Sequence, residues 1–404
     1  THHPAQQKRG AGSEVRLITL VFSSLAHYQH HYCKQTLVNH GVNMCTTSSS
    51  DSAPPVLHAP FHITLLVASL YVLSGVTQPL LMELAKQAGL ADKSCQIYMQ
   101  AYYLGTASVV LLARNDEQLS WKTTIKTGAV ASIDIIAQTM NYSGATMAGP
   151  TIFAIVYSSV TIWCALLSRV LLQREMTWLQ WLSVVVVFFG LGVTGFSSLN
   201  LGPEVARGTV LIVFGSALHA LMYVLSEVLM NNESEVVSAK RYCAVYGSSA
   251  CFIYFLWQML YTRRHFNELI LEPMQMAGTT YCYALIVLFA IALMSMLHSA
   301  TFFHTVKYVP GGSTSAGVLK ALQAVLVFAA TSLAFCNHFG GEEMCFTVDK
   351  MVSLCIVVAG VVLFGKATEI SERKGTKSIG AKQTYKRINS LSDFELEAAR
   401  KNQV

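Results

Sequence analysis

One stretch of this chain decides its fold class: Gly312-Ser-Thr-Ser-Ala-Gly-Val-Leu-Lys320-Ala-Leu-Gln-Ala-Val-Leu-Val-Phe328. Apart from Lys320 it carries no charge, and runs of roughly 20 apolar residues have the length of a helix that crosses a bilayer. A charge in hydrocarbon is costly, so such a residue usually faces a cavity on a substrate or ion path. The stretch therefore predicts a membrane helix with Lys320 at a cavity.

The rest of the composition agrees with this prediction. Of the 404 residues, 53% are hydrophobic and 12% are charged, whereas soluble domains carry about 25% charged residues. We predict an all-α integral membrane protein with ten transmembrane helices. The expected spans are Ile63–Met82, Gln96–Ala113, Thr124–Tyr142, Met147–Ser168, Leu179–Phe196, Gly208–Val228, Ala244–Tyr261, Tyr281–Thr305, Thr314–Phe335 and Val348–Lys366.

Charge predicts the orientation of these spans. With ten spans both termini lie on one side, and that side holds 21 of the 28 Lys and Arg residues, the opposite side 6, and Lys320 lies within a span. By the positive-inside rule both termini are expected in the cytosol. The same distribution accounts for the net charge of +6, so no nucleic-acid partner is expected. Residues 1–61 form a cytosolic segment, and residues 368–404 a polar, disordered cytosolic tail.

The two halves of the chain resemble each other. Tyr142-Ser-Gly-Ala-Thr-Met-Ala-Gly149 aligns with the stretch that ends in Gly317, and Val186-Val-Phe-Phe-Gly190 aligns with Ile356-Val-Val-Ala-Gly360. Five spans per half is an odd number, so the halves, 62–200 and 205–367, would be inverted repeats, with a substrate site between them. Chance similarity between Gly-rich helices is the alternative. Gly190 and Gly360 would also let helix backbones approach closely.

A second charge lies comparably deep, at Asp134 in the third expected span. Gln138, four residues later, shares its helix face, and Gln323 follows Lys320 by three residues. Lys320 would hold a phosphate or carboxylate. Asp134 would bind a cationic group or carry a coupling proton. Alternatively, Lys320 and Asp134 pair with each other, and Gln323 is a packing amide.

Two further groups of residues are candidates. Tyr157, Ser158 and Ser159 would line the cavity from the fourth span, although hydroxyls in membrane helices often bond only to the preceding turn. His219, Tyr223 and Glu227 recur every four residues on one helix face and could form a proton relay, unless Glu227, near the cytosolic end, is simply solvated.

Other chemistry is not indicated. The ten cysteines show no metal-ligand spacing, no P-loop occurs, and no nucleophile–base set stands out. We therefore expect no metal, no cofactor and no enzymatic activity.

Several stretches resemble the drug/metabolite transporter superfamily, in its nucleotide-sugar-transporter-like branch of solute carriers. The resemblance covers about residues 60–370 and is carried by these motifs: Leu171-Leu-Gln-Arg-Glu-Met-Thr-Trp-Leu-Gln-Trp181, Leu221-Met-Tyr-Val-Leu-Ser-Glu227, Gly317-Val-Leu-Lys320 and Val358-Ala-Gly-Val-Val-Leu-Phe364. It implies an antiporter of an endomembrane, Golgi or ER first, with the vacuole, lysosome or plasma membrane left open. It also implies that Lys320 contacts the nucleotide.

Three functions follow as hypotheses. The first is a secondary transporter with alternating access for a small polar or anionic metabolite, including a nucleotide sugar exchanged by antiport. The second is a proton-coupled exporter of amines, amino acids or drugs, with Asp134 as its central group. The third is a non-transporting membrane scaffold. The expected partners are a small-molecule substrate and the lipid bilayer, and a homodimer is left open.

Overall fold

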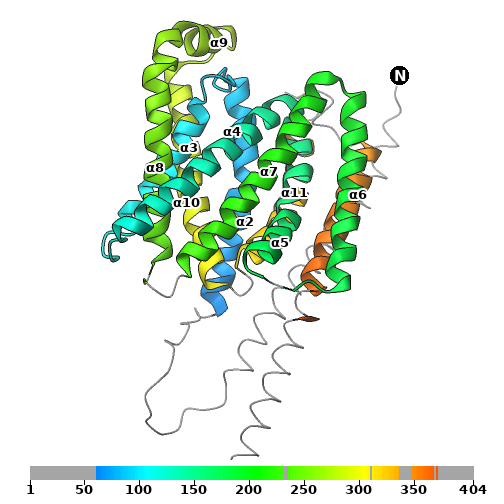
Figure 1. Cartoon of the computed structure of the whole chain (residues 1–404). Helices are drawn as coiled ribbons and strands as arrows, with labels where there is room; N and C mark the ends of the chain where they lie inside the picture. Colours follow the sequence, from blue (N-terminus) through cyan, green and yellow to red (C-terminus); the bar gives the residue numbers. More distant parts are fainter. Residues whose placement is uncertain are drawn as a thin grey trace, which may run out of the picture.

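The computed structural model describes residues 61–173, 175–231, 235, 237–309, 312–335, 347–367 and 370–371. The predicted cytosolic segment before residue 61 and the tail at 368–369 and 372–404 lie outside these residues. Within them all regular structure is helical and no strand occurs (Figure 1). The all-helical prediction is confirmed.

The helices follow one another closely along the chain. Their bounds are α2 Phe61–Gln87, α3 Ile97–Ser108, η1 Val109–Leu111, α4 Trp121–Tyr157, α5 Val160–Leu171, α6 Trp178–Asn200, α7 Pro203–Met230, α8 Ala239–Leu260, η2 Thr262–His265, η3 Asn267–Leu271, α9 Glu272–Met276, α10 Tyr281–Tyr308 and α11 Gly312–Phe335. A last helix, Val348–Ala367, is unlabelled and orange in Figure 1.

Six of the described helices are long and apolar enough to cross a membrane. They are α2, α7, α8, α10, α11 and Val348–Ala367, and the bent pair α4 and α5 makes a seventh if it counts as one span. The helices α3 and α6 are shorter in apolar length, since α3 has only 12 residues and the apolar part of α6 is Trp178–Thr194. A multi-pass helical membrane protein is thus supported, and ten spans remain a prediction.

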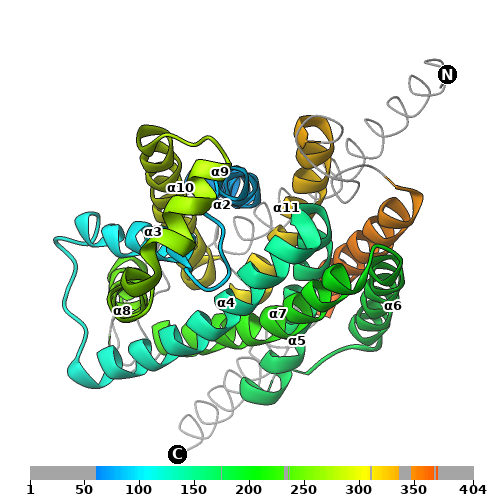
Figure 2. The same cartoon turned by 90° about the horizontal axis from the view of Figure 1, so that it is seen from above.

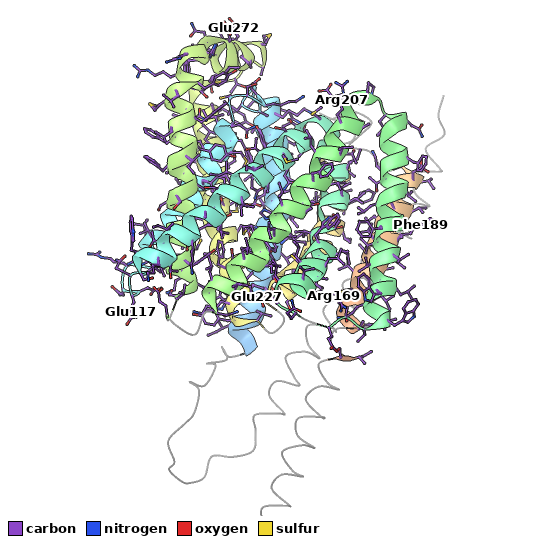
Figure 3. All side chains as sticks on the ribbon, in the orientation of Figure 1. Glu117, Arg169, Phe189, Arg207, Glu227 and Glu272 are labelled. Carbon is purple, nitrogen blue, oxygen red and sulfur yellow. The ribbon has the colours of Figure 1, made fainter. Side chains whose placement is uncertain are left out.

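Gly149 divides α4 into two helical parts. Its φ of 81° and ψ of 159° are non-helical, a backbone region that essentially only glycine enters. Glu117, which precedes α4, and Arg169, near the end of α5, lie at the same end of the bundle (Figure 3). The chain therefore leaves this end and returns to it between the two residues. The turning point lies slightly after the predicted loop between Tyr142 and Met147.

Charged residues in loops and near helix ends lie at two opposite ends of the bundle. Glu117, Arg169 and Glu227 lie at one end, and Arg207 and Glu272 lie at the other (Figure 3). This separation agrees with loops that alternate between the two sides of the membrane, as the count of Lys and Arg residues assumed. Which end faces the cytosol remains a prediction.

The helices of the two halves pack in reciprocal pairs. The α4 helix lies along α7, and α10 lies along α2; α5 contacts α7, and α11 contacts α2. The α3 helix packs against its expected counterpart α8. Seen from above, α6 and Val348–Ala367 stand side by side at one edge of the molecule (Figure 2).

Glycines bring α6 and Val348–Ala367 into close contact. A Cβ atom on Gly190 would lie 2.7 Å from Cγ2 of Val357, and one on Gly360 would lie 2.6 Å from Cγ2 of Val187. Ser353 also donates a hydrogen bond to the carbonyl of Gly190 at 2.7 Å. Gly190 and Gly360 thus allow the close backbone approach expected from small residues in membrane helices.

Candidate functional site

A cavity opens between the two halves of the bundle, where α2, α3 and α4 face α7, α10 and α11. Its empty volume, open mouth included, is about 740 Å³. Five of the predicted residues line it: Gln138, Tyr157, His219, Lys320 and Gln323. The other lining residues are Gly75, Gln78, Pro79, Met82, Tyr98, Met99, Tyr102, Asn141, Tyr142, Ala145, Phe153, Ala154, His298, Ala324 and Val327.

Lys320 is the cation of this cavity. Its side chain is buried, with the residue 7% exposed, and Nζ lies 5.2 Å from the ring centroid of Tyr71 and 5.4 Å from that of Tyr157. Within the described ranges no carboxylate lies at ion-pair distance from it. Two aromatic faces offset only part of the cost of a buried ammonium, so the site is suited to an anion.

His298 on α10 supports Lys320. Its Nε2 lies 3.1 Å from Nζ of Lys320, and its Nδ1 lies 3.1 Å from the hydroxyl of Ser74 on α2. An ammonium can only donate, so Nε2 accepts from Lys320 and the Nδ1–H donates to Ser74. The Tyr71 ring stacks on the imidazole at a centroid distance of 4.8 Å. Lys320 is thereby held at the wall of the cavity by side chains from α2 and α10.

Asp134 lies behind the cavity wall and is 1% exposed. Its Oδ1 accepts from Nδ1 of His219 at 2.6 Å, and its Oδ2 accepts from the hydroxyl of Tyr103 at 2.5 Å and from that of Tyr246. The carboxyl group thus joins α4 to α3, α7 and α8. The predicted alternative of an ion pair between Asp134 and Lys320 is not what the structure contains.

His219 connects this buried carboxyl group to the cavity. Its Nδ1 bonds to Asp134, while the residue itself lines the cavity. Its Nε2 has no hydrogen-bond partner in the described part of the chain. The ring packs 5.6 Å from Tyr157 and 4.7 Å from Tyr223, measured between centroids. One imidazole nitrogen is therefore left for a proton or a ligand.

Amide groups supply further hydrogen-bonding capacity. Both amide atoms of Asn141, Nε2 of Gln78 and the Tyr142 hydroxyl are buried without a hydrogen-bond partner among the described residues, and all three residues line the cavity. Gln323 instead donates from Nε2 to the carbonyl of Tyr71 at 3.0 Å. Buried polar groups are normally paired, so these groups indicate a place for a polar ligand.

Pro79 adds to the polarity of the α2 wall. Proline has no N–H, so the carbonyl of Gly75 lacks its usual donor within the helix. Both residues line the cavity.

The remaining predicted residues lie away from the cavity. Ser158 donates to the carbonyl of Ile155 at 2.6 Å, and Ser159 pairs with the hydroxyl of Ser216 at 3.2 Å. The Ser158 hydroxyl therefore bonds to the preceding turn, whereas the Ser159 hydroxyl joins its segment to α7.

The predicted relay along α7 is broken up in space. Tyr223 packs against the His219 ring, but Glu227 lies at the end of the bundle (Figure 3). There it is buried and accepts from the amide and hydroxyl of Ser313 at 3.0 and 2.5 Å. Glu227 thus caps the start of α11 and is not solvated.

Several residues of the site were not among the predicted ones. His298 and Tyr71 contact Lys320, and Tyr103 and Tyr246 donate to Asp134. Asn141 adds a buried amide without a partner among the described residues. Polar residues inside apolar runs are the only sequence signal that could have found them. Among the described residues no group of three His, Cys, Asp or Glu side chains is placed to hold a metal ion.

The chain has limited similarity to known proteins. No family model matches the chain. An uncharacterised protein of Schizosaccharomyces pombe is 28% identical over 123 residues, which are 29% of this chain and 37% of that protein. The match thus spans little more than a third of the relative's length. A crystal structure of another protein is similar with a TM-score of 0.49 and 13% identity, over 75% of this chain and 97% of that chain.

Proposed function

We propose that the protein is a secondary transporter that moves a small organic anion by alternating access, with Lys320 holding the anion. The observation that carries this proposal is the position of Lys320: buried, facing a cavity between the halves, and without a carboxylate at ion-pair distance in the described residues. Buried charges are normally paired, so a substrate anion is the partner that this ammonium needs.

Reciprocal packing supports two inverted repeats of five spans within this transporter. The contact between α4 and α7 has a counterpart in the contact between α10 and α2. Likewise, the contact of Gly190 with Val357 has a counterpart in the contact of Gly360 with Val187. A two-fold relation produces such exchanged pairs, in which residue i meets j and j meets i. Substrate sites in inverted-repeat transporters lie at the repeat interface near the middle of the membrane, which is where Lys320 would be.

The surroundings of Asp134 favour an anion over an amine. Its carboxylate already accepts from His219, Tyr103 and Tyr246 and does not itself line the cavity. A cationic substrate would have to displace these donors, whereas an anion meets Lys320 directly. A nucleotide sugar, exchanged across an endomembrane with both protein termini in the cytosol, is one member of the proposed substrate class.

Ligand-induced thermal stabilisation of the purified chain tests this proposal. The anion panel is benzoate, citrate, sulfate, UMP and UDP-glucose, and tyramine represents the amines. Lys320→Met removes the charge from the cavity. Lys307→Met is the matched control, because Lys307 is a partly buried lysine that donates to the carbonyl of Val237 outside the cavity.

We expect saturable stabilisation of the wild type and of Lys307→Met by at least one anion. In Lys320→Met the affinity should fall roughly 10- to 100-fold, because a charge-assisted hydrogen bond contributes about 1.5–3 kcal/mol. Equal stabilisation of Lys320→Met, stabilisation by tyramine alone, or none at all would contradict the proposal.

A further inference from the structure

We propose that the Asp134–His219 pair is a proton site, and that a proton on Nε2 of His219 travels with the anion held by Lys320. The inference rests on the proposed transport function and specifies its coupling: symport of an anion and a proton. The only chemical change is the binding and release of a proton. The lone pair of Nε2 takes a proton on one side of the membrane, forming an imidazolium, and releases it on the other.

The hydrogen bonds of His219 leave one nitrogen for this purpose. A carboxylate can only accept, so Nδ1 keeps its hydrogen and donates it to Asp134 at 2.6 Å. Nε2 is then the basic nitrogen, and the residue lines the cavity. A second proton on the ring gives an imidazolium whose counter-charge, Asp134, is already in contact.

The balance of charge couples the proton to the anion. With the cavity empty and His219 neutral, Lys320 and Asp134 contribute opposite charges that cancel. A monovalent anion on Lys320 leaves one negative charge in excess, and an uncompensated charge in a poorly solvated site is costly. A proton on His219 restores neutrality. By linkage, the anion then favours the proton as much as the proton favours the anion.

The position of the two groups allows such mutual influence. The Tyr157 ring contacts both, with Nζ of Lys320 5.4 Å from its centroid and the His219 ring 5.6 Å away. Charges on two groups that share this aromatic neighbour influence each other where the effective dielectric constant is low.

Among the described residues, the titratable groups around Asp134 and His219 add no further carboxylate. Phenols and one imidazole surround the pair, and Lys320 is the cation among them. From the packed helices these groups are Tyr71 on α2, Tyr102 and Tyr103 on α3, Tyr157 on α4, Tyr223 on α7, Tyr242, Tyr246 and Tyr254 on α8, His298 on α10, and Lys320 on α11.

The hydrogen bond between Asp134 and His219 also crosses the boundary between the halves. Asp134 belongs to α4 of the first half and His219 to α7 of the second, and these helices pack along each other. A proton on His219 turns this hydrogen bond into an ion pair and so strengthens a contact between the two parts that rock. Loading of both proton and anion would thus change the energy of the interface itself.

Uptake of the anion panel into proteoliposomes of the full chain tests the inference. Radiolabelled anion entry is measured at about pH 6 and about pH 8, either side of the ordinary histidine range, while a trapped pH dye reports proton entry. Protein-free liposomes correct for passive entry of protonated acids. His219→Asn keeps a donor for Asp134 but offers no basic nitrogen, and the control is His304→Asn, whose imidazole lies on α10 outside the cavity.

We expect wild-type uptake to be at least about fivefold faster at the lower pH, because the co-transported proton is itself a substrate and is more abundant there. Proton entry should accompany anion entry. His219→Asn should flatten the pH dependence, and His304→Asn should keep it.

Anion uptake by the wild type without proton entry would overturn the coupling and leave the transport proposal intact. The same holds if folded His219→Asn keeps the wild-type pH dependence. If no panel anion enters at all, the proposed transport function fails, and the coupling fails with it. The dye measurement needs only wild-type protein, so the test does not depend on a variant that folds.

Discussion

At the scale of residues, the sequence indicated the two charges of the site but not their partners. Lys320 and Asp134 were visible because each interrupts an apolar run. Their pairing depends on which helix faces touch, and the chain alone does not determine this. His298 and Tyr246 lie far from Asp134 in sequence, so nothing local indicated a common network. Ser158 and Ser159 were predicted for the cavity and bond to helix neighbours instead.

The buried amide of Asn141 gives a test at this scale. Asn141→Leu removes two polar atoms that have no partner in the described residues. Because an unsatisfied buried group costs about 1–3 kcal/mol, we expect the purified protein without ligand to melt at a higher temperature. Binding of a panel anion should weaken. Asn231→Leu, at the exposed end of α7, is the control. A lower melting temperature together with unchanged anion binding would contradict the assignment of Asn141 to a ligand site.

At the scale of elements, glycines decide how the helices turn and approach. The repeat motifs predicted from sequence contain Gly149, Gly190 and Gly360. In the structure Gly149 makes a non-helical turn, and the other two allow close contacts between helices. The exact turning point could not be predicted, since apolar residues continue on both sides of Gly149. The length of α3 was likewise overestimated, because the apolar run continues into a 3-10 turn.

The contact of α6 with the last helix can be tested by adding one methyl group. Gly190→Ala places a Cβ against Val357 and should destabilise the protein by about 1–3 kcal/mol, the usual cost of overpacking. Gly192→Ala on the same helix meets no atom within 4 Å and should cost nothing. Thermal unfolding in detergent compares the two.

Truncation of the opposing side chain sharpens this test. In Gly190→Ala/Val357→Ala the clashing methyl group is gone, so the double variant should lose less stability than the sum of the single variants. Strict additivity, or equal losses for Gly190→Ala and Gly192→Ala, would show that the two helices do not meet as described.

The turn at Gly149 makes a separate prediction. An alanine cannot adopt φ 81° and ψ 159° without strain of about 1–3 kcal/mol. Gly149→Ala should therefore lower the melting temperature, whereas Gly128→Ala in the same helix, where the nearest atom is 3.7 Å from the added Cβ, should not. Melting of both variants at the wild-type temperature would argue for one continuous helix through residue 149.

At the scale of the whole molecule, hydropathy was enough to predict the fold class. The number of spans was less certain, because six helices meet the length and hydropathy expected of a span and others are shorter or bent. Hydropathy also could not predict the cavity, which forms where helices from both halves meet. The separation of Glu117 and Arg207 to opposite ends supports the alternation of loops (Figure 3).

Epitope tags test the proposed orientation. A tag inserted after Glu117 should be accessible from the cytosolic side, and one inserted after Gly278 only from the opposite side, because the positive-inside rule places the Arg114–Lys122 loop in the cytosol. Antibody binding to sealed vesicles before and after permeabilisation distinguishes a tag on the cytosolic side from a tag on the opposite side. Equal access to both tags in sealed vesicles would contradict the topology.

The most direct test of the central claim is uptake of a stabilising panel anion into proteoliposomes by the wild type, Lys320→Met and Lys307→Met. If the cavity is a transport site with Lys320 as its anion-holding group, the wild type and Lys307→Met accumulate the anion saturably and Lys320→Met does not. Saturable binding with no uptake by the wild type, or uptake by Lys320→Met at the wild-type rate, would contradict the account.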